Sequence, residues 1–137
     1  MSDLIIKGHL GIGPKASGEA LVATDNFSAR YDLDRIKGIF SRPAHKLFEQ
    51  GYVGKVLVLN IAKGGVATAW MLHEMASRGM APAALLLNFA NPIIAQGAAF
   101  GQVPLIDRFD SDITTMIKTG DHVEVNPATG DVIVTQS

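Results

Sequence analysis

The sequence predicts an α/β domain in which a central, partly parallel sheet is combined with an antiparallel β layer. Two observations carry this prediction. In the middle of the chain, an apolar strand, a helix and a second apolar strand follow one another, which is the pattern of a parallel strand–helix–strand unit. On either side of this unit, short apolar segments separated by glycines and turn residues indicate antiparallel strands.

The central unit begins with Val56–Ile61, in which only Asn60 is polar. A strand with apolar side chains on both faces is typical of a buried parallel sheet. A helix is predicted over about Val66–Arg78 and ends at Gly79, because glycine readily adopts the left-handed conformation at a helix C-terminus. Ala84–Leu87 is the second predicted buried strand.

The clearest antiparallel signal lies near the C-terminus. His122–Val125 and Asp131–Val134 alternate with period two across the turn Asn126–Gly130, which predicts a hairpin. The remaining predicted elements are strands at Leu4–Ile6, Glu19–Val22 and Val103–Ile106, a short helix at Asn91–Gly97, and another that Ser111 or Asp112 caps and that runs to Ile117.

Composition limits the possible functions. A chain of 137 residues with 47% hydrophobic residues is expected to form one folded domain over residues 1–137. With 12 Lys and Arg against 13 Asp and Glu, it offers no broad cationic face, which argues against nucleic acid as a partner. Its apolar stretches are shorter than a membrane span, and no signal peptide is visible, so we expect a cytoplasmic protein without a membrane partner.

The sequence contains no cysteine. It therefore has no disulfide, no thiolate nucleophile and no cysteine ligand for zinc or an iron–sulfur cluster. We expect this chain to bind no metal or cofactor, so that any cluster in its chemistry would be held by another chain.

The strongest local motif is Lys63–Gly65, between a predicted buried strand and a predicted helix. Helix N-termini carry unpaired N–H groups, and glycines let an anion approach the backbone closely. The amides around Gly65–Thr68, which include that of Val66, are candidates for binding a carboxylate or phosphate, with Lys63 adding a charge. A tight turn that only reverses the chain is the alternative.

Other motifs are weaker. Gly11–Ala16 matches the dinucleotide pattern G-x-G-x-x-A, but a predicted strand follows it where a helix is required. The four histidines show no metal-ligand spacing, and only His45 lies in a long polar loop of the kind that often carries function. A solvated loop is the alternative there. Trp70 and Met71 are interpreted as core or subunit-contact residues.

Several segments match a known family in their order and spacing: Ser17–Leu21, Gly54–Val58, Lys63–Gly64, Leu72, Glu74, Ala81–Ala84, Gly97–Ala98, Val103–Asp107 and Lys118–Val125. In these segments the chain resembles the small subunit, or swivel domain, of the aconitase X family. The resemblance covers nearly the whole chain and implies a swivelling β/β/α domain.

The resemblance also implies a function. Members of this family are dehydratases of hydroxy acids such as cis-3-hydroxy-L-proline or, in archaea, mevalonate 5-phosphate. A large subunit carries an iron–sulfur cluster, and the swivel subunit closes over it and contributes the base. We therefore expect a two-chain hydro-lyase, inactive without its large subunit, whose substrate is a small hydroxy acid. A non-catalytic swivel module for anion binding or regulation, or a phosphomevalonate dehydratase-like small subunit, is the alternative.

One position departs from the family pattern. The family usually has a basic residue, glycine and serine at the strand–helix turn, and the serine is the presumed base, whereas Gly65 stands here. Lys63 and Thr68 are the first candidates to replace it, followed by His45. Residues expected to contact the substrate are Gly64, Gly65, Val66 and Ser28, the last in a loop whose aromatic–glycine centre is replaced by charged residues.

Overall fold

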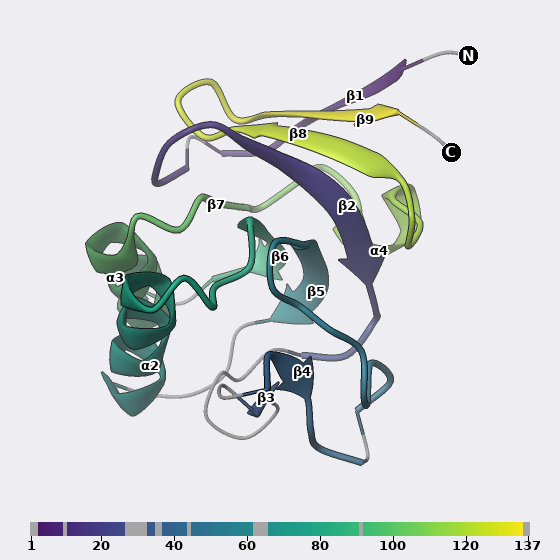
Figure 1. Ribbon diagram of the computed structural model, residues 1–137. Helices are drawn as coiled ribbons and strands as arrows, with labels where there is room; N and C mark the ends of the chain where they lie inside the picture. The colour runs from purple at the N-terminus through teal and green to yellow at the C-terminus, as the bar shows by residue number, and fades with distance from the viewer. Residues whose placement is uncertain are drawn as a thin grey trace.

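The computed structural model describes residues 3–9, 11–26, 33–34, 37–43, 45–61, 66–90 and 92–135. In these residues, seven strands form one mixed sheet with the order β1-β9-β8-β2-β5-β6-β7 (Figure 1). In chain order the strands are β1 (Asp3–Lys7), β2 (Ala16–Val22), β5 (Val56–Ile61), β6 (Ala84–Phe89), β7 (Leu105–Asp107), β8 (His122–Asn126) and β9 (Asp131–Thr135). A small antiparallel sheet contains β3 (Leu33–Asp34) and β4 (Ile39–Phe40).

Strand β2 joins an antiparallel layer to a parallel layer. Its first half, Ala16–Glu19, pairs antiparallel with β8, and its second half, Ala20–Val22, pairs parallel with β5. Figure 1 shows β2 running from the upper layer, with β1, β9 and β8, down to the layer that contains β5 and β6. A Cβ atom on Gly18 would lie 2.9 Å from the carbonyl oxygen of Gly54, so a glycine is needed where the two layers meet.

The two central parallel strands are buried on both faces, as predicted. The first four residues of β5 and the first four of β6 are all buried. Because side chains alternate along a strand, Leu57 and Leu59 enter one hydrophobic cluster, and Val56 and Val58 enter another on the opposite face. The parallel layer therefore lies between two hydrophobic cores.

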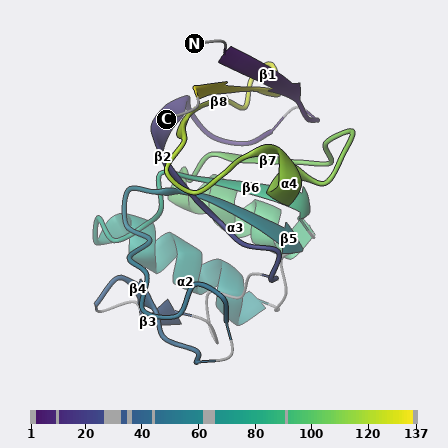
Figure 2. The same cartoon turned by 90° about the vertical axis from the view of Figure 1, so that its right-hand side faces the viewer.

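Different elements cover the two faces. Helices α2 (Val66–Ser77) and α3 (Pro92–Gly101) pack on one face of the parallel layer (Figure 1, Figure 2). The antiparallel layer and α4 (Ile113–Met116) cover the other. The result is the β/β/α arrangement that the family resemblance implied.

Most element boundaries match the predictions. Gly79 follows α2 with φ of 70°, as expected for a helix C-terminus. Helix α3 is longer than predicted, reaching Gly101. Strand β7 begins at Leu105 instead of Val103, because the Val103 N–H bonds to the Ala98 carbonyl at the end of the helix.

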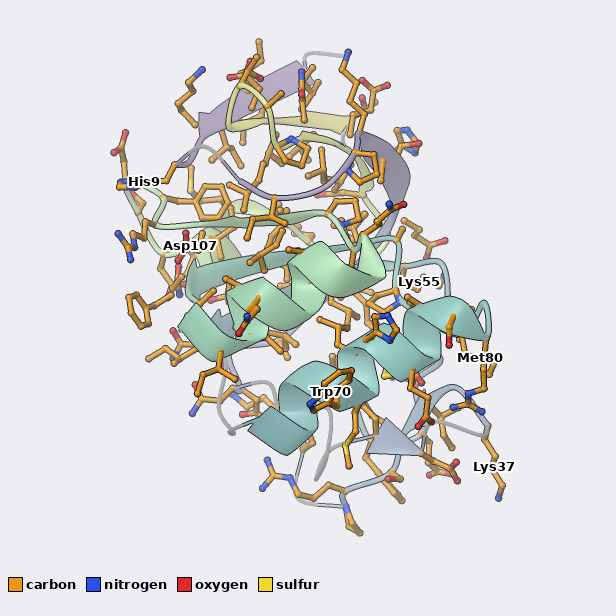
Figure 3. All side chains as sticks on the ribbon, turned by 90° about the vertical axis from the view of Figure 1, so that its left-hand side faces the viewer. His9, Lys37, Lys55, Trp70, Met80 and Asp107 are labelled. Carbon is orange, nitrogen blue, oxygen red and sulfur yellow. The ribbon has the colours of Figure 1, made fainter. Side chains whose placement is uncertain are left out.

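Two further expectations can be compared with the structure. Trp70 is 63% exposed on the outside of α2, so it is not a core residue (Figure 3). The segment after the G-x-G-x-x-A pattern is strand β2, which agrees with rejecting a dinucleotide site. In the described ranges, the structure contains no helix with both the length and the apolar character to cross a membrane.

Candidate functional site

The parallel strands β2, β5, β6 and β7 end at one edge of the sheet, called here the carboxyl edge. Helix α2 begins at Val66, after β5 ends at Ile61, and α3 begins at Pro92, after β6 ends at Phe89. In open parallel sheets, ligands bind outside this edge, where loop side chains and helix N-terminal amides converge. The carboxyl edge is therefore the candidate site.

Several residues predicted to form the site lie outside the described part of the chain. These are Lys63, Gly64, Gly65 and Ser28. Val66 and Thr68 lie in the first turn of α2, where the structure describes the backbone and not the side chains. The helix terminus is thus at the carboxyl edge, and the roles predicted for these residues stay predictions.

His45 is 2% exposed and uses both ring nitrogens in hydrogen bonds. Its Nδ1 accepts from the Leu47 N–H (3.1 Å), so Nε2 carries the proton and donates to the Asn26 carbonyl (3.0 Å). The ring also stacks on Phe40, with centroids 4.7 Å apart. This geometry favours a positioning role for His45, which fastens its loop to the segment after β2; its predicted role as a base stays a prediction.

The segment after β2 is fastened on both sides. The Asp25 carboxylate accepts from the Lys46 N–H (2.7 Å), and the Asp25 carbonyl accepts from the Asn60 N–H (3.0 Å). The side-chain oxygen of Asn26 accepts from the Ile61 N–H (3.3 Å). These bonds hold the end of β2 and the 45–47 loop against the end of β5.

Asn88 is the centre of a polar network at the carboxyl edge. Its Nδ2 donates to Asn60 Oδ1 (2.9 Å) and to Asp112 Oδ1 (2.8 Å). Its Oδ1 accepts from the N–H of buried Ile113 (2.8 Å). One amide side chain therefore ties together the ends of β5 and β6 and the start of α4.

The network stabilises the charged form of a carboxylate. Asp112 is the N-cap of α4 and accepts from the Thr114 N–H. Hydrogen bonds from the Thr114 hydroxyl and then from the Asn88 amide lower the pKa of Asp112 from its ordinary value. Asp112 thus contributes a fixed negative charge to one side of the edge at neutral pH.

Arg108 lies at the other side, directly after β7. Its Cζ lies 5.4 Å from the centroid of the Phe89 ring, and its Nε lies 3.5 Å from Asp107 Oδ2. Asp107 also accepts from the Ala90 N–H (3.0 Å), and it lies near the loop that contains His9 (Figure 3). A hollow of about 150 Å³ adjoins this corner and is lined by Gly11, Ile12, Ala90, Ala95, Leu105, Asp107 and Arg108.

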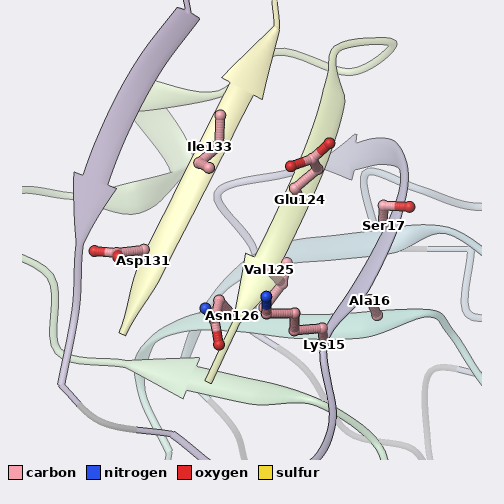
Figure 4. A pocket seen from close by; sticks show the side chains of 8 residues that line it. All are labelled: Lys15, Ala16, Ser17, Glu124, Val125, Asn126, Asp131 and Ile133. Atoms are coloured by element: carbon pink, nitrogen blue, oxygen red, sulfur yellow. The ribbon is translucent and has the colours of Figure 1, made fainter. Parts of the chain in front are cut away.

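A second hollow lies on the outer face of the antiparallel layer (Figure 4). Its volume is about 310 Å³, and it is lined by Lys15, Ala16, Ser17, Glu124, Val125, Asn126, Asp131 and Ile133. None of these residues belongs to the carboxyl edge or to the sites predicted from the sequence. Within the described ranges, no three His, Asp or Glu side chains are placed to bind one metal ion.

Comparison with known families identifies the fold. The family model of the aconitase X swivel domain matches residues 5–134. The chain belongs to the aconitase X swivel-domain family. This confirms the family resemblance seen in the sequence.

Curated relatives and solved structures agree with this assignment. The swivel domain is 34% identical to the phosphomevalonate dehydratase small subunit of Methanocella arvoryzae, over 91% of this chain and 95% of that one. It is 35% identical to the small subunit of the same name from Methanothrix thermoacetophila, over 94% and 93%. The crystal structure of Thermococcus kodakaraensis aconitase X in its holo-form matches with a TM-score of 0.89 and 28% identity, over 97% of this chain and 99% of that one. The solution structure of a UPF0107 protein matches with a TM-score of 0.85 and 27% identity, over 97% and 100%.

Sequence reasoning missed the polar network of this swivel domain. Asn60 and Asn88 each follow four apolar residues and precede another apolar residue, and their strands pair in register, Leu59 with Leu87 and Ile61 with Phe89. A lone polar residue at the same place in two buried strands was the available signal. Asp112 was predicted only as a helix cap, because its link to Asn88 depends on the fold.

Proposed function

We propose that this chain is the small subunit of a two-chain aconitase X-type dehydratase whose substrate is a phosphorylated hydroxy acid of the phosphomevalonate class. The observation that carries the proposal is its 34–35% identity, over nearly the full length of both chains, to archaeal small subunits named for that activity. A relationship spread over the whole chain supports a shared task more strongly than a shared fold does.

The carboxyl edge suits the part that a swivel subunit would play. In a dehydration, a C–H bond and the C–O bond of a neighbouring carbon break, a C=C bond forms, and the proton and hydroxyl leave as water. An iron–sulfur cluster on the large subunit would supply a Lewis acid for the departing hydroxyl. This chain, which lacks cysteine, would supply electropositive amides at the start of α2 and the group that takes the proton.

The base must differ from the serine expected in the family, because Gly65 stands in its place. Thr68 offers a hydroxyl one turn into α2, and Lys63 could act if loss of solvent lowered the pKa of its amine. His45 ranks below both, because its Nδ1 already accepts the Leu47 N–H. Contacts to the substrate are proposed for Gly64, Gly65, Val66 and Ser28.

Because glycine at position 65 has no hydroxyl to act as a base, it also favours a second candidate function. A swivel domain without its base could bind an anion at the 64–68 segment and regulate a partner without turnover. This candidate predicts phosphate binding by the assembled protein in the absence of any dehydration.

The test is reconstitution with an aconitase X-type large subunit under anaerobic conditions. Dehydration of phosphomevalonate and of cis-3-hydroxy-L-proline would be followed by mass spectrometry as the loss of water. We expect turnover of phosphomevalonate by the complex and none by either chain alone. An assembled complex that dehydrates neither acid would contradict the proposal, and one that dehydrates only the hydroxyproline would reassign the substrate.

A further inference from the structure

The backbone of Arg108 adopts a conformation that few non-glycine residues adopt. Its φ is 59°, in the left-handed region, and its N–H donates to the Asn88 carbonyl (3.1 Å). Such conformations persist where surrounding contacts impose them, and they are concentrated at functional sites. The turn after β7 thus directs this arginine from a fixed position at the carboxyl edge.

The side chain of Arg108 is held in place by its neighbours but is still accessible to a ligand. The Cζ atom of the guanidinium lies over the Phe89 ring, and Nε contacts Asp107, whose carboxylate accepts from the Ala90 N–H. The side chain is still 53% exposed, and within the described residues the ion pair with Asp107 is made through Nε. Two parallel N–H donors therefore remain available beside the 150 Å³ hollow.

A guanidinium with two unused donors matches the geometry of a phosphate group. Arginine binds phosphate oxygens through paired, charge-assisted hydrogen bonds, and stacking on an aromatic ring limits the freedom it must lose on binding. Because Nε makes the closest approach to Asp107, the two terminal nitrogens of the guanidinium are the groups that a ligand would meet. The corner therefore fits a phosphate better than it fits a neutral group.

The distance across the edge fits a substrate charged at both ends. Strand β7 pairs with β6, and β6 pairs with β5. Two strand spacings, roughly 10 Å, separate the end of β7 from the end of β5, after which α2 begins. We propose that Arg108 binds the phosphate of the substrate while the carboxylate and hydroxyl lie toward α2, so that Arg108 selects phosphorylated hydroxy acids. This inference rests on the proposed function and names its specificity residue.

The experiment compares the wild-type two-chain complex with Arg108→Ala, Arg108→Lys and a matched control, Arg78→Ala. Arg78 is also an exposed arginine paired with a carboxylate, Glu74, but it follows the opposite end of α2. Calorimetry would measure Kd for phosphomevalonate and for its unphosphorylated counterpart, mevalonate. Steady-state assays would separate KM from kcat, and inorganic phosphate would be tested as a competitor in the wild type.

We expect Arg108→Ala to raise Kd and KM for phosphomevalonate about 10- to 100-fold with kcat nearly unchanged. The Kd for mevalonate should stay unchanged. Arg108→Lys should have an intermediate Kd for phosphomevalonate, because lysine keeps the charge but lacks the paired donors of arginine. Arg78→Ala should match the wild type. Equal losses for both acids, or a loss no larger than that of Arg78→Ala, would overturn the inference. So would a wild type that binds both acids equally or is not inhibited by phosphate. A third outcome separates the two proposals. If the complex shows no turnover but binds phosphomevalonate in preference to mevalonate, and Arg108→Ala loses that preference, only the dehydratase proposal is overturned.

Discussion

The outer hairpin, formed by β8 and β9, and the carboxyl edge both carry polar side chains. These side chains find their hydrogen-bond partners differently in the two regions. On the hairpin and on β1 beside it, outward-facing groups pair across adjacent strands at the surface. Lys7 Nζ, for example, lies 2.9 Å from Asp131 Oδ1. At the carboxyl edge, Asn88 bonds to Asn60 and Asp112, which are 28 and 24 residues away in the sequence. Surface pairs of the first kind are worth little, whereas loss of Asn88 leaves the N–H of buried Ile113 without its acceptor.

The difference separates the part of the domain that forms the fold from the part that forms the site. The hairpin needs only its alternating inward valines, Val123, Val125, Val132 and Val134, all of which are buried. The edge needs one amide to hold three elements in a fixed relation. Substitutions should therefore be tolerated on the hairpin surface and costly at the edge.

The largest effect is expected for Asn88→Ala. This change removes three hydrogen bonds and leaves the N–H of buried Ile113 without its acceptor, which should lower the free energy of unfolding by about 2–3 kcal/mol. Urea denaturation of the purified chain measures it. Asn126→Ala on the hairpin is the matched control, because the buried Oδ1 of Asn126 has no hydrogen-bond partner in the described residues, and a change within about 0.5 kcal/mol is expected. Equal losses in the two variants would remove the distinction.

A smaller effect is expected from salt, which should change the pKa of a carboxyl group on the hairpin and not that of one at the carboxyl edge. The pKa of Asp131 is lowered chiefly by the hydrogen bond from Lys7, and that of Asp112 chiefly by the Thr114 hydroxyl and the Asn88 amide, which are neutral donors. Salt weakens ion pairs between exposed side chains, so at about 1 M salt the pKa of Asp131 should rise toward its ordinary value while that of Asp112 stays low. Carboxyl-carbon NMR titrations at low and high salt would measure both, and a shift of Asp112 as large as that of Asp131 would contradict this explanation.

The stability of the fold should depend on pH with the same sign through Asp131 and through Asp112. A carboxyl whose pKa is lower in the folded than in the unfolded state stabilises the fold above the unfolded value. That contribution is lost as the pH falls through the folded pKa. Stability should therefore decline on acidification below the ordinary value of 3.8, and the decline from Asp112 should disappear in Asp112→Asn.

The sequence predicted the layers of this domain better than it predicted the site. Strands such as Val56–Ile61 and the hairpin are specified by local patterns of apolar residues, and the structure confirms them. The contacts of Asn88 and Arg108 depend instead on which strands become neighbours and on a positive φ at a residue other than glycine. His45 shows the same limit, because its loop position suggested exposure while the fold buries it against Phe40.

The central claim is that the carboxyl edge is the surface turned toward the large subunit and its substrate. Hydrogen–deuterium exchange of this chain, alone and in the two-chain complex, tests it most directly. We expect slower exchange in the complex at residues 24–26, 88–90 and 107–109, with the amides of 122–135 unchanged. Protection confined to the outer hairpin, with the carboxyl edge exchanging as in the free chain, would contradict the claim.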